Sequence, residues 1–257
     1  MFSYTYSKLR GNYTGLTSTD LADGGGGRNA PNNSRSFDEP YFQFNANGGS
    51  SSGLLPTDRP SAFKGYAYYE LPWGKFHNKL NTNFGLFQVL YSGTPQTSYA
   101  DVGYSSPGAW PVDIVNRGKW VDVTQDPTTG AITVGSPRTF RTPWYMQSDF
   151  SIDQNYKITE RNTLSFSVTF TNLLNQHAVT AYGQQIDSNI VQSFLSPNGS
   201  FVASQGYYAN AERPYDVQSL LNQQNLFGEG NTINSQYGKP YLFQASRNIR
   251  LGVKFTF

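Results

Sequence analysis

The chain has 257 residues, a formal net charge of +2 and no cysteine, and 37% of its residues are hydrophobic. The nearly balanced charge argues against a nucleic-acid-binding protein, and no run of about 18 apolar residues could cross a membrane as a helix. Aromatic residues make up 16% of the chain, which is high for a disordered protein. A transmembrane β-barrel accounts for these features, since only alternate residues of its strands meet lipid and aromatic side chains ring its rims.

Six segments alternate between apolar and polar side chains, with the period of two that a β-strand requires. In chain order they are residues 1–10, 61–71, 79–91, 144–157, 164–171 and 249–257. The third segment loses its phase between Gly85 and Gln88, and we expect a β-bulge there. The first segment begins at Met1 without the basic and apolar stretches of a secretory signal, so we expect a fragment of a longer exported polypeptide.

The connections between these segments are alternately short and long. The short ones are Pro72–Asn78 and Thr159–Asn162, and the long ones are residues 21–53, 93–142 and 176–242. Bacterial barrels have short periplasmic turns and long extracellular loops, so the short links should face the periplasm. Within the long loops the sequence predicts a flexible tip at Gly24–Gly27, a hairpin around Asp126–Gly130 and a short helix within Asp216–Gln224.

The fold class that follows is all-β, an antiparallel transmembrane β-barrel segment of six strands with long extracellular loops. The smallest bacterial barrels need about eight strands, so six strands cannot close. We therefore expect a curved sheet that is open on its own, covering residues 1–257 as one barrel segment.

Several stretches resemble the C-terminal part of TonB-dependent transporters of the outer membrane, especially the large Oar-like branch. Residues 149–160, followed by the alternation of 164–170 and by Asn172-Leu-Leu-Asn175, resemble the penultimate hairpin of these barrels. Further similar stretches are Asp58-Arg59-Pro60, Tyr69–Gly74, Tyr207–Tyr215 and Asn234–Pro240, the last of which leads into the closing strand.

This resemblance implies a parent barrel of about 22 strands, closed by an N-terminal plug and coupled to the TonB system, of which this chain is the last six strands. It implies an integral protein of the outer membrane that binds and imports a scarce ligand, such as an iron chelate, a glycan or a peptide. It implies no enzyme and no cofactor. The plug and signal peptide are absent from the chain, so we expect no transport by this segment alone.

The same resemblance suggests which residues of the long loops would bind the ligand. Aromatic and amide side chains of the long loops could stack on sugars or bind peptides, and the alternative is that they pack the loops together. They are Tyr99, Tyr104, Trp110, Trp120, Tyr207, Tyr208 and Asn210.

Strand parity assigns the charged residues of the wall. Asp149 and Asp153 share the polar face of the fourth strand, and Arg250 and Lys254 share that of the last, so we expect all four to face the lumen. They form either a charged lattice against the plug or merely a hydrated lining. Arg247 has lipid-facing parity and should emerge at the outer rim, where its guanidinium could pair with lipopolysaccharide phosphates.

The last strand places an alternating apolar row before a terminal aromatic residue, Leu251, Val253, Phe255 and Phe257. Such an ending resembles the signal that the outer-membrane assembly machinery reads. The alternative is that Phe257 is a girdle aromatic that anchors the strand at the interface.

Catalytic and metal sites are not indicated. His77 and His177 lie far apart without cysteine, and the spacing of Asp101, Asp113, Asp122 and Asp126 fits turns better than a Ca²⁺ loop. Two other classes share the strand pattern. They are a passive porin or adhesin barrel, and a secreted β-sandwich that binds carbohydrate, although sandwich strands recur every 8–12 residues or so.

Overall fold

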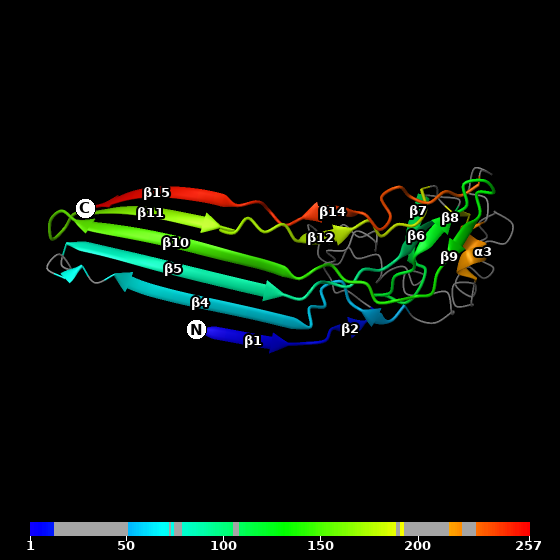
Figure 1. Ribbon diagram of the computed structural model, residues 1–257, viewed down its shortest axis with the longest axis horizontal. Helices are drawn as coiled ribbons and strands as arrows, with labels where there is room; N and C mark the ends of the chain where they lie inside the picture. The colour runs from blue at the N-terminus through cyan, green and yellow to red at the C-terminus, as the bar shows by residue number, and fades with distance from the viewer. Residues whose placement is uncertain are drawn as a thin grey trace.

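The computed structural model describes residues 1–12, 51–71, 73–74, 79–104, 108–188, 191–192, 216–222 and 230–257. The described part has two regions along its long axis, a six-stranded sheet and an outer region of shorter strands (Figure 1). The short link Thr159–Asn162 and the described residues of the other, Trp73 and Gly74, lie at the end of the sheet remote from the outer region, together with the C-terminus (Figure 1).

The six-stranded sheet is antiparallel throughout, and its spatial order follows the chain. Its members are β1 (Phe2–Tyr6), β4 (Ser61–Leu71), β5 (Leu80–Tyr91), β10 (Tyr145–Lys157), β11 (Thr163–Thr171) and β15 (Asn248–Thr256). The predicted all-β, antiparallel class is therefore confirmed, with strand bounds that match the prediction closely except for β1. The sheet is open in the described residues, because β1 and β15 each pair on one side only.

Apolar side chains of neighbouring strands lie directly opposite one another and form continuous rows across the sheet. Ile152 pairs with both Phe84 and Val168, and Val168 pairs in turn with Leu251. Aromatic rings also stack diagonally between neighbouring rows, with centroids 6.2 Å apart for Phe84 and Phe150. Opposite residues of antiparallel strands share a face, so these rows make one apolar face.

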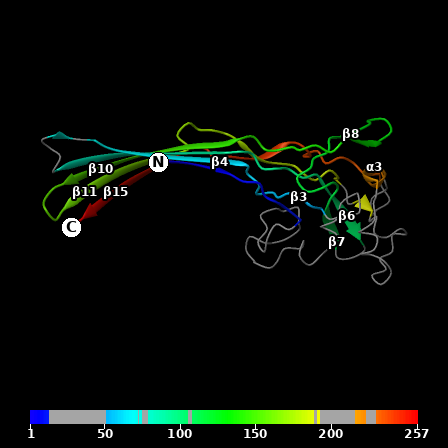
Figure 2. The ribbon, with the colours of Figure 1, turned by 90° about the horizontal axis from the view of Figure 1, so that it is seen from below.

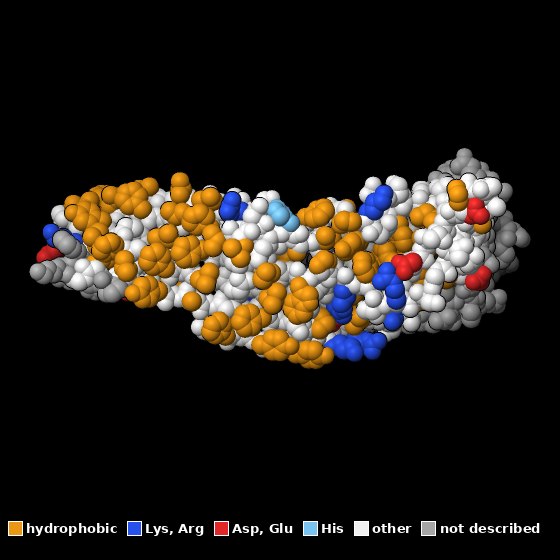
Figure 3. Space-filling model, in the orientation of Figure 1, with side chains coloured by type: hydrophobic (Ala, Val, Ile, Leu, Met, Phe, Trp, Pro, Cys, Tyr) orange, Lys and Arg blue, Asp and Glu red, His pale blue; other side chains and the backbone are white. Residues whose placement is uncertain are grey.

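Large side chains of the apolar face are exposed, above all on the edge strand β15, and half-buried towards the middle of the sheet. Leu251 is 74% and Val253 is 70% exposed, and Figure 3 shows the apolar side chains gathered over the six strands. The sheet is curved, and β3, β6 and β7 lie on the side away from this face (Figure 2). Exposed apolar patches of this extent mark a surface that contacts a membrane or another protein.

The predicted β-bulge between Gly85 and Gln88 is wrong. The register of β5 runs without a shift against both neighbours, and Gln88 lies opposite Gly65 and Ser148. Gln88 interrupts the apolar pattern because its amide oxygen accepts the hydroxyl of Ser148, which satisfies two polar groups on the apolar face. The loss of phase therefore reflects a cross-strand hydrogen bond and not an extra residue.

The outer region is built from the long connections. It contains the hairpin β6 (Tyr99–Tyr104) and β7 (Gly108–Asp113), the hairpin β8 (Val123–Gln125) and β9 (Ile132–Val134), and the pair β12 (Val179–Tyr182) and β14 (Pro240–Phe243). Smaller elements are β2 (Arg10–Gly11), β3 (Gly53–Leu54), β13 (Val191–Gln192) and the helix α3 (Val217–Leu221). The predicted hairpin around Asp126 and the predicted helix are both confirmed. The predicted loop tip at Gly24–Gly27 lies outside the described residues.

The buried hydrophobic core lies in this outer region and not on the sheet. Its members are Ala100, Ile114, Val115, Val121, Ile132, Ile186 and Leu221. Trp120 is 2% exposed and stacks on Tyr237 with ring centroids 4.5 Å apart. The Tyr237 hydroxyl donates to the carbonyl of Val121, and burial raises its pKa. The described parts of the connections 93–142 and 176–242 therefore form a packed unit.

A buried ion pair joins the sheet to the outer region. Asp58 is fully buried, accepts the backbone N–H of Leu9 at 2.6 Å and pairs with the guanidinium of Arg141. Arg141 also donates to the carbonyl of Gly93 at 2.8 Å. A Cβ on Gly93 would lie 1.6 Å from the carbonyl oxygen of Thr142, so only glycine fits this approach of two chains. In the described ranges, no helix is both long and apolar enough to cross a membrane.

Candidate functional site

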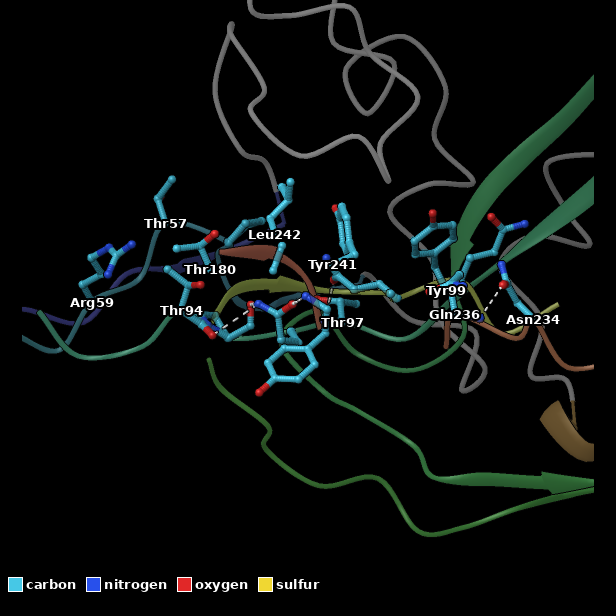
Figure 4. Close-up of a pocket in the computed structure, with 18 residues that line it drawn as sticks. Thr57, Arg59, Thr94, Thr97, Tyr99, Thr180, Asn234, Gln236, Tyr241 and Leu242 are labelled. Atoms are coloured by element: carbon cyan, nitrogen blue, oxygen red, sulfur yellow. Dashed lines mark hydrogen bonds between the residues drawn. The ribbon is translucent and has the colours of Figure 1, made fainter. Parts of the chain in front are cut away.

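A cavity of about 880 Å³ opens where the outer region meets the sheet (Figure 4). Its walls come from residues 56–59, 94–99, 180–185 and 234–242, which are distant in the sequence. Amides, hydroxyls and tyrosine rings dominate its lining. The volume is in the range of about 300–1,000 Å³ that small-molecule sites occupy.

Backbone and amide hydrogen bonds hold the walls of the cavity together. The backbone N–H of Thr97 donates to the side-chain oxygen of Gln184 at 2.9 Å, and that of Tyr99 donates to the Gln184 carbonyl at 3.1 Å. A Cβ on Gly183 would lie 2.1 Å from the carbonyl oxygen of Gln236, so two wall segments approach as closely as backbone permits. These contacts join residues that are about 90 and about 50 positions apart in the sequence. A local sequence pattern therefore could not predict the cavity.

Arg59 lies at one end of the cavity, beside Thr57 and Thr94 (Figure 4). Its Nη1 donates to the carbonyl of Ser92 at 3.1 Å, and its guanidinium carbon lies 5.6 Å from the centroid of the Tyr91 ring. Burial lowers the pKa of this guanidinium. In the sequence, Arg59 stood out only as part of the stretch Asp58-Arg59-Pro60 that resembles TonB-dependent transporters, and no role was predicted for it.

The four charged residues expected to face the lumen share the polar face of the sheet. Asp153 of β10 pairs with Ser167 of β11, and Ser167 pairs on its other side with Gly252 of β15. Gly252 lies between Arg250 and Lys254 on the same face. Asp149 accepts the backbone N–H of Asn172 at 2.8 Å and the amide of Gln147. In the part of the chain described, no ion pair links these acids and bases. Their role against a plug stays a prediction.

The turn Asn172–Asn175, which carried part of the resemblance, ties three strands together. Asn172 is 1% exposed, has a φ of 54° and donates from its side chain to the carbonyls of Gln176 and Ala245, both at 2.9 Å. Asn175 accepts the backbone N–H of Arg247 at 2.9 Å. The turn therefore fixes where β15 begins.

Arg247 precedes β15 and is exposed, with its Nη1 3.4 Å from the carbonyl oxygen of Leu173. Binding of Arg247 to lipopolysaccharide stays a prediction. Phe257 is 92% exposed, and its ring lies 6.1 Å from that of Phe255. Recognition of this row by the assembly machinery likewise stays a prediction.

The loop aromatics divide between packing and the cavity. Trp120 packs the outer region, as the alternative interpretation held, whereas Tyr99 lines the cavity. The side chains of Tyr104 and Trp110, and residues 207–210 altogether, lie outside what the structure describes.

The candidate metal residues have other partners where they are described. Asp126 accepts the backbone N–H groups of Thr128 and Thr129 and forms a turn, and these bonds lower its pKa. Asp122 pairs with Arg138, and Asp113 with Arg117. His177 is exposed, and His77 lies outside the described residues. No cluster that could hold a metal ion occurs among the described residues.

The fold and these surfaces define an all-β protein with one exposed apolar face, a polar opposite face and a cavity at one end. Comparison with known proteins points to a particular relative. The chain is 24% identical, over 256 residues and 99% of its length, to the TonB-dependent transporter Oar of Myxococcus xanthus. It spans 20% of the length of that relative. No family model matches the chain, and no solved structure matches it.

Proposed function

We propose that this chain is the C-terminal part of the wall of a TonB-dependent transporter of the outer membrane, in a barrel of about 22 strands. The observation that carries the proposal is the similarity to the Oar transporter along 99% of the chain. The exposed apolar face of the six-stranded sheet supports it, because alternate residues of a barrel strand face lipid.

In this proposal the strands have two environments. The rows that contain Phe84, Ile152 and Leu251 contact lipid, and the face with Asp149, Asp153, Arg250 and Lys254 lines a hydrated lumen that a plug occupies. The cavity beside Arg59 lies at the end of the six-stranded sheet where the long connections are found. These connections should face the outside, so the cavity receives ligand before the TonB system moves the plug.

The proposal also gives roles to the edges of the sheet. β1 and β15 expose unpaired backbone groups, which lipid cannot satisfy, so each must pair with a strand outside this segment. The apolar row that ends at Phe257 serves recognition by the assembly machinery, and Arg247 contacts lipopolysaccharide at the outer rim.

A secreted β-sandwich is the less favoured alternative. It would cover the apolar face with a second sheet, and none of the sheets among the described residues lies on that face. The exposure of Leu251 and Val253 is then unexplained.

Two observations test the proposed function. The reading frame upstream of the Met1 codon should continue in frame and encode an export signal and a plug. The encoded protein should then fractionate with the outer membrane and bind the periplasmic domain of TonB. A stop codon directly upstream, or a full-length protein found only in soluble fractions, would contradict the proposal.

A further inference from the structure

Arg59 differs from the other arginines that are buried or half-buried in the described chain. Arg117 pairs with Asp113 at 3.2 Å, and Arg141 pairs with Asp58. No carboxylate of the described residues lies within ion-pair distance of Arg59. Its neighbour in sequence, Asp58, is fully engaged by Arg141 and by the backbone of Leu9.

Arg59 is half-buried, and its guanidinium contacts the Tyr91 ring and the Ser92 carbonyl, neither of which carries a negative charge. Withdrawing a guanidinium from water is unfavourable unless a negative group compensates it. Within the described residues, the guanidinium of Arg59 makes one hydrogen bond, from Nη1 to the neutral carbonyl of Ser92. The remaining donors of the guanidinium are suited to a carboxylate, which accepts two parallel hydrogen bonds from arginine.

The rest of the described lining is uncharged and combines amide and hydroxyl groups with apolar side chains. Among the described residues that line it, Arg59 carries the one formal charge. Thr57 and Tyr241 are exposed, and Tyr241 lies midway along the cavity in Figure 4. Hydroxyl groups and a tyrosine ring match the hydroxyls and the apolar faces of a sugar.

We propose that the cavity binds a short acidic oligosaccharide, with Arg59 binding a uronate carboxylate and Tyr241 contacting a neighbouring sugar ring. This inference rests on the proposed function, because it concerns the ligand that the transporter would take from outside. It assigns the cavity a substrate class that the strand pattern does not indicate.

The charges of the ligand distinguish an acidic oligosaccharide from the two other candidate ligand classes, a peptide and an iron chelate. A free peptide brings an ammonium group with its carboxylate, and the described lining contains no acidic side chain to bind it. An iron chelate of high negative charge needs several cations, whereas the described lining supplies one. A sugar with a single carboxylate at one end matches one guanidinium at one end of the cavity.

The test uses isothermal titration calorimetry on the full-length protein that contains this chain, purified from outer membranes in detergent. The probes are glucuronosylmaltose, which is maltotriose with its terminal sugar replaced by one uronate, the neutral trisaccharide maltotriose and the tripeptide Ala-Ala-Ala. We expect glucuronosylmaltose to bind and the other two to bind at least about tenfold more weakly, as loss of a charged hydrogen bond of about 1.5–3 kcal/mol requires.

Variants assign the preference to Arg59. Arg59→Gln should lower the affinity for glucuronosylmaltose about tenfold or more and leave that for maltotriose unchanged, and Arg59→Lys should keep part of the preference. Arg161→Gln is the matched control, since it removes the same charge from an exposed link at the opposite end of the sheet. Should Arg59→Gln fail to fold, the unmodified protein still decides, because added salt must weaken binding of glucuronosylmaltose and not of maltotriose.

Three results would overturn the inference. They are absence of glucuronosylmaltose binding, equal binding of the acidic and neutral trisaccharides, and an Arg59→Gln variant that binds glucuronosylmaltose as the unmodified protein does. Any of them in a protein that resides in the outer membrane and binds TonB would refute the ligand and leave the proposed function standing. A protein that does not reach the outer membrane would refute both.

Discussion

Asn172 shows how one side chain can organise several strands. It adopts a positive φ of 54°, which asparagine tolerates better than most residues, and it satisfies three backbone groups from a nearly fully buried position. Asn172→Ala should destabilise the protein by about 2–4 kcal/mol, because it removes three part-buried hydrogen bonds and disfavours this backbone conformation.

The measurement for Asn172 is urea unfolding of the detergent-solubilised protein. Asn172→Gly separates the two causes, since glycine accepts the backbone conformation and restores none of the hydrogen bonds. It should recover about 1 kcal/mol relative to alanine. An alanine variant as stable as the unmodified protein would show that the turn does not fix the start of β15.

Asp122 makes the outer region sensitive to acid. The guanidinium of Arg138 and the indole N–H of Trp120 donate to its carboxylate and hold its pKa below the ordinary value of 3.8. A depressed folded-state pKa contributes stability above the unfolded value, and this contribution is lost as pH falls through the folded value. We therefore expect Trp120 fluorescence to stay constant down to about pH 4 and to change below it.

Two variants check the assignment to Asp122. Asp122→Asn should abolish the acid transition, and Trp120→Phe should remove the fluorescence that reports it. A transition that persists in Asp122→Asn would mean that other carboxylates control this part of the protein.

At the scale of an element, adjacent residues of β15 lie on opposite faces of the sheet. Leu251 lies in the apolar row and Arg250 lies on the polar face. Leu251→Arg should destabilise the membrane-inserted protein by about 2–4 kcal/mol, the cost of an arginine on the lipid face near the midplane. Asn155→Arg, on the polar face of β10, is the control and should cost less than about 1 kcal/mol. Equal costs in lipid bilayers would contradict the assignment of the faces.

Deletion of Phe257 tests the end of the same strand. If the terminal row serves the assembly machinery, the full-length variant should insert into outer membranes more slowly than the parent while its stability after insertion changes little. Thr256→Ala, next to it on the polar face, is the control. Unchanged insertion kinetics would leave Phe257 as an interfacial anchor only.

The sequence predicted the long strands well because one rule governs them. Each row of the sheet repeats every second residue, so the pattern around Val168 or Leu251 can be read locally. Gln88 broke this rule through a hydrogen bond to Ser148, a residue of another strand, and the predicted bulge was wrong for that reason. The cavity was not predicted, because Arg59 acquires its surroundings from segments far apart in the chain.

At the scale of the whole molecule, the pair of Asp58 and Arg141 couples the outer region to the sheet. Asp58→Asn keeps an acceptor for Leu9 and removes the charge that faces Arg141. We expect a loss of about 2–3 kcal/mol in urea unfolding, below the full cost of breaking a buried pair because Arg141 is partly exposed. Asp126→Asn in an exposed turn is the control, and an equally small effect of both substitutions would contradict a coupling role.

The central claim is that one face of the six-stranded sheet contacts lipid and the other contacts water. The chain contains no cysteine, so single cysteines can be placed in turn along β11, with any cysteine in the rest of the full-length protein replaced by serine. The measurement is labelling of the full-length protein in native outer membranes with a membrane-impermeant maleimide and with a lipid-soluble one. We predict that positions 164, 166, 168 and 170 react only with the lipid-soluble reagent, and that positions 165, 167 and 169 react with the aqueous one. Equal reaction of both sets with the aqueous reagent would contradict the account.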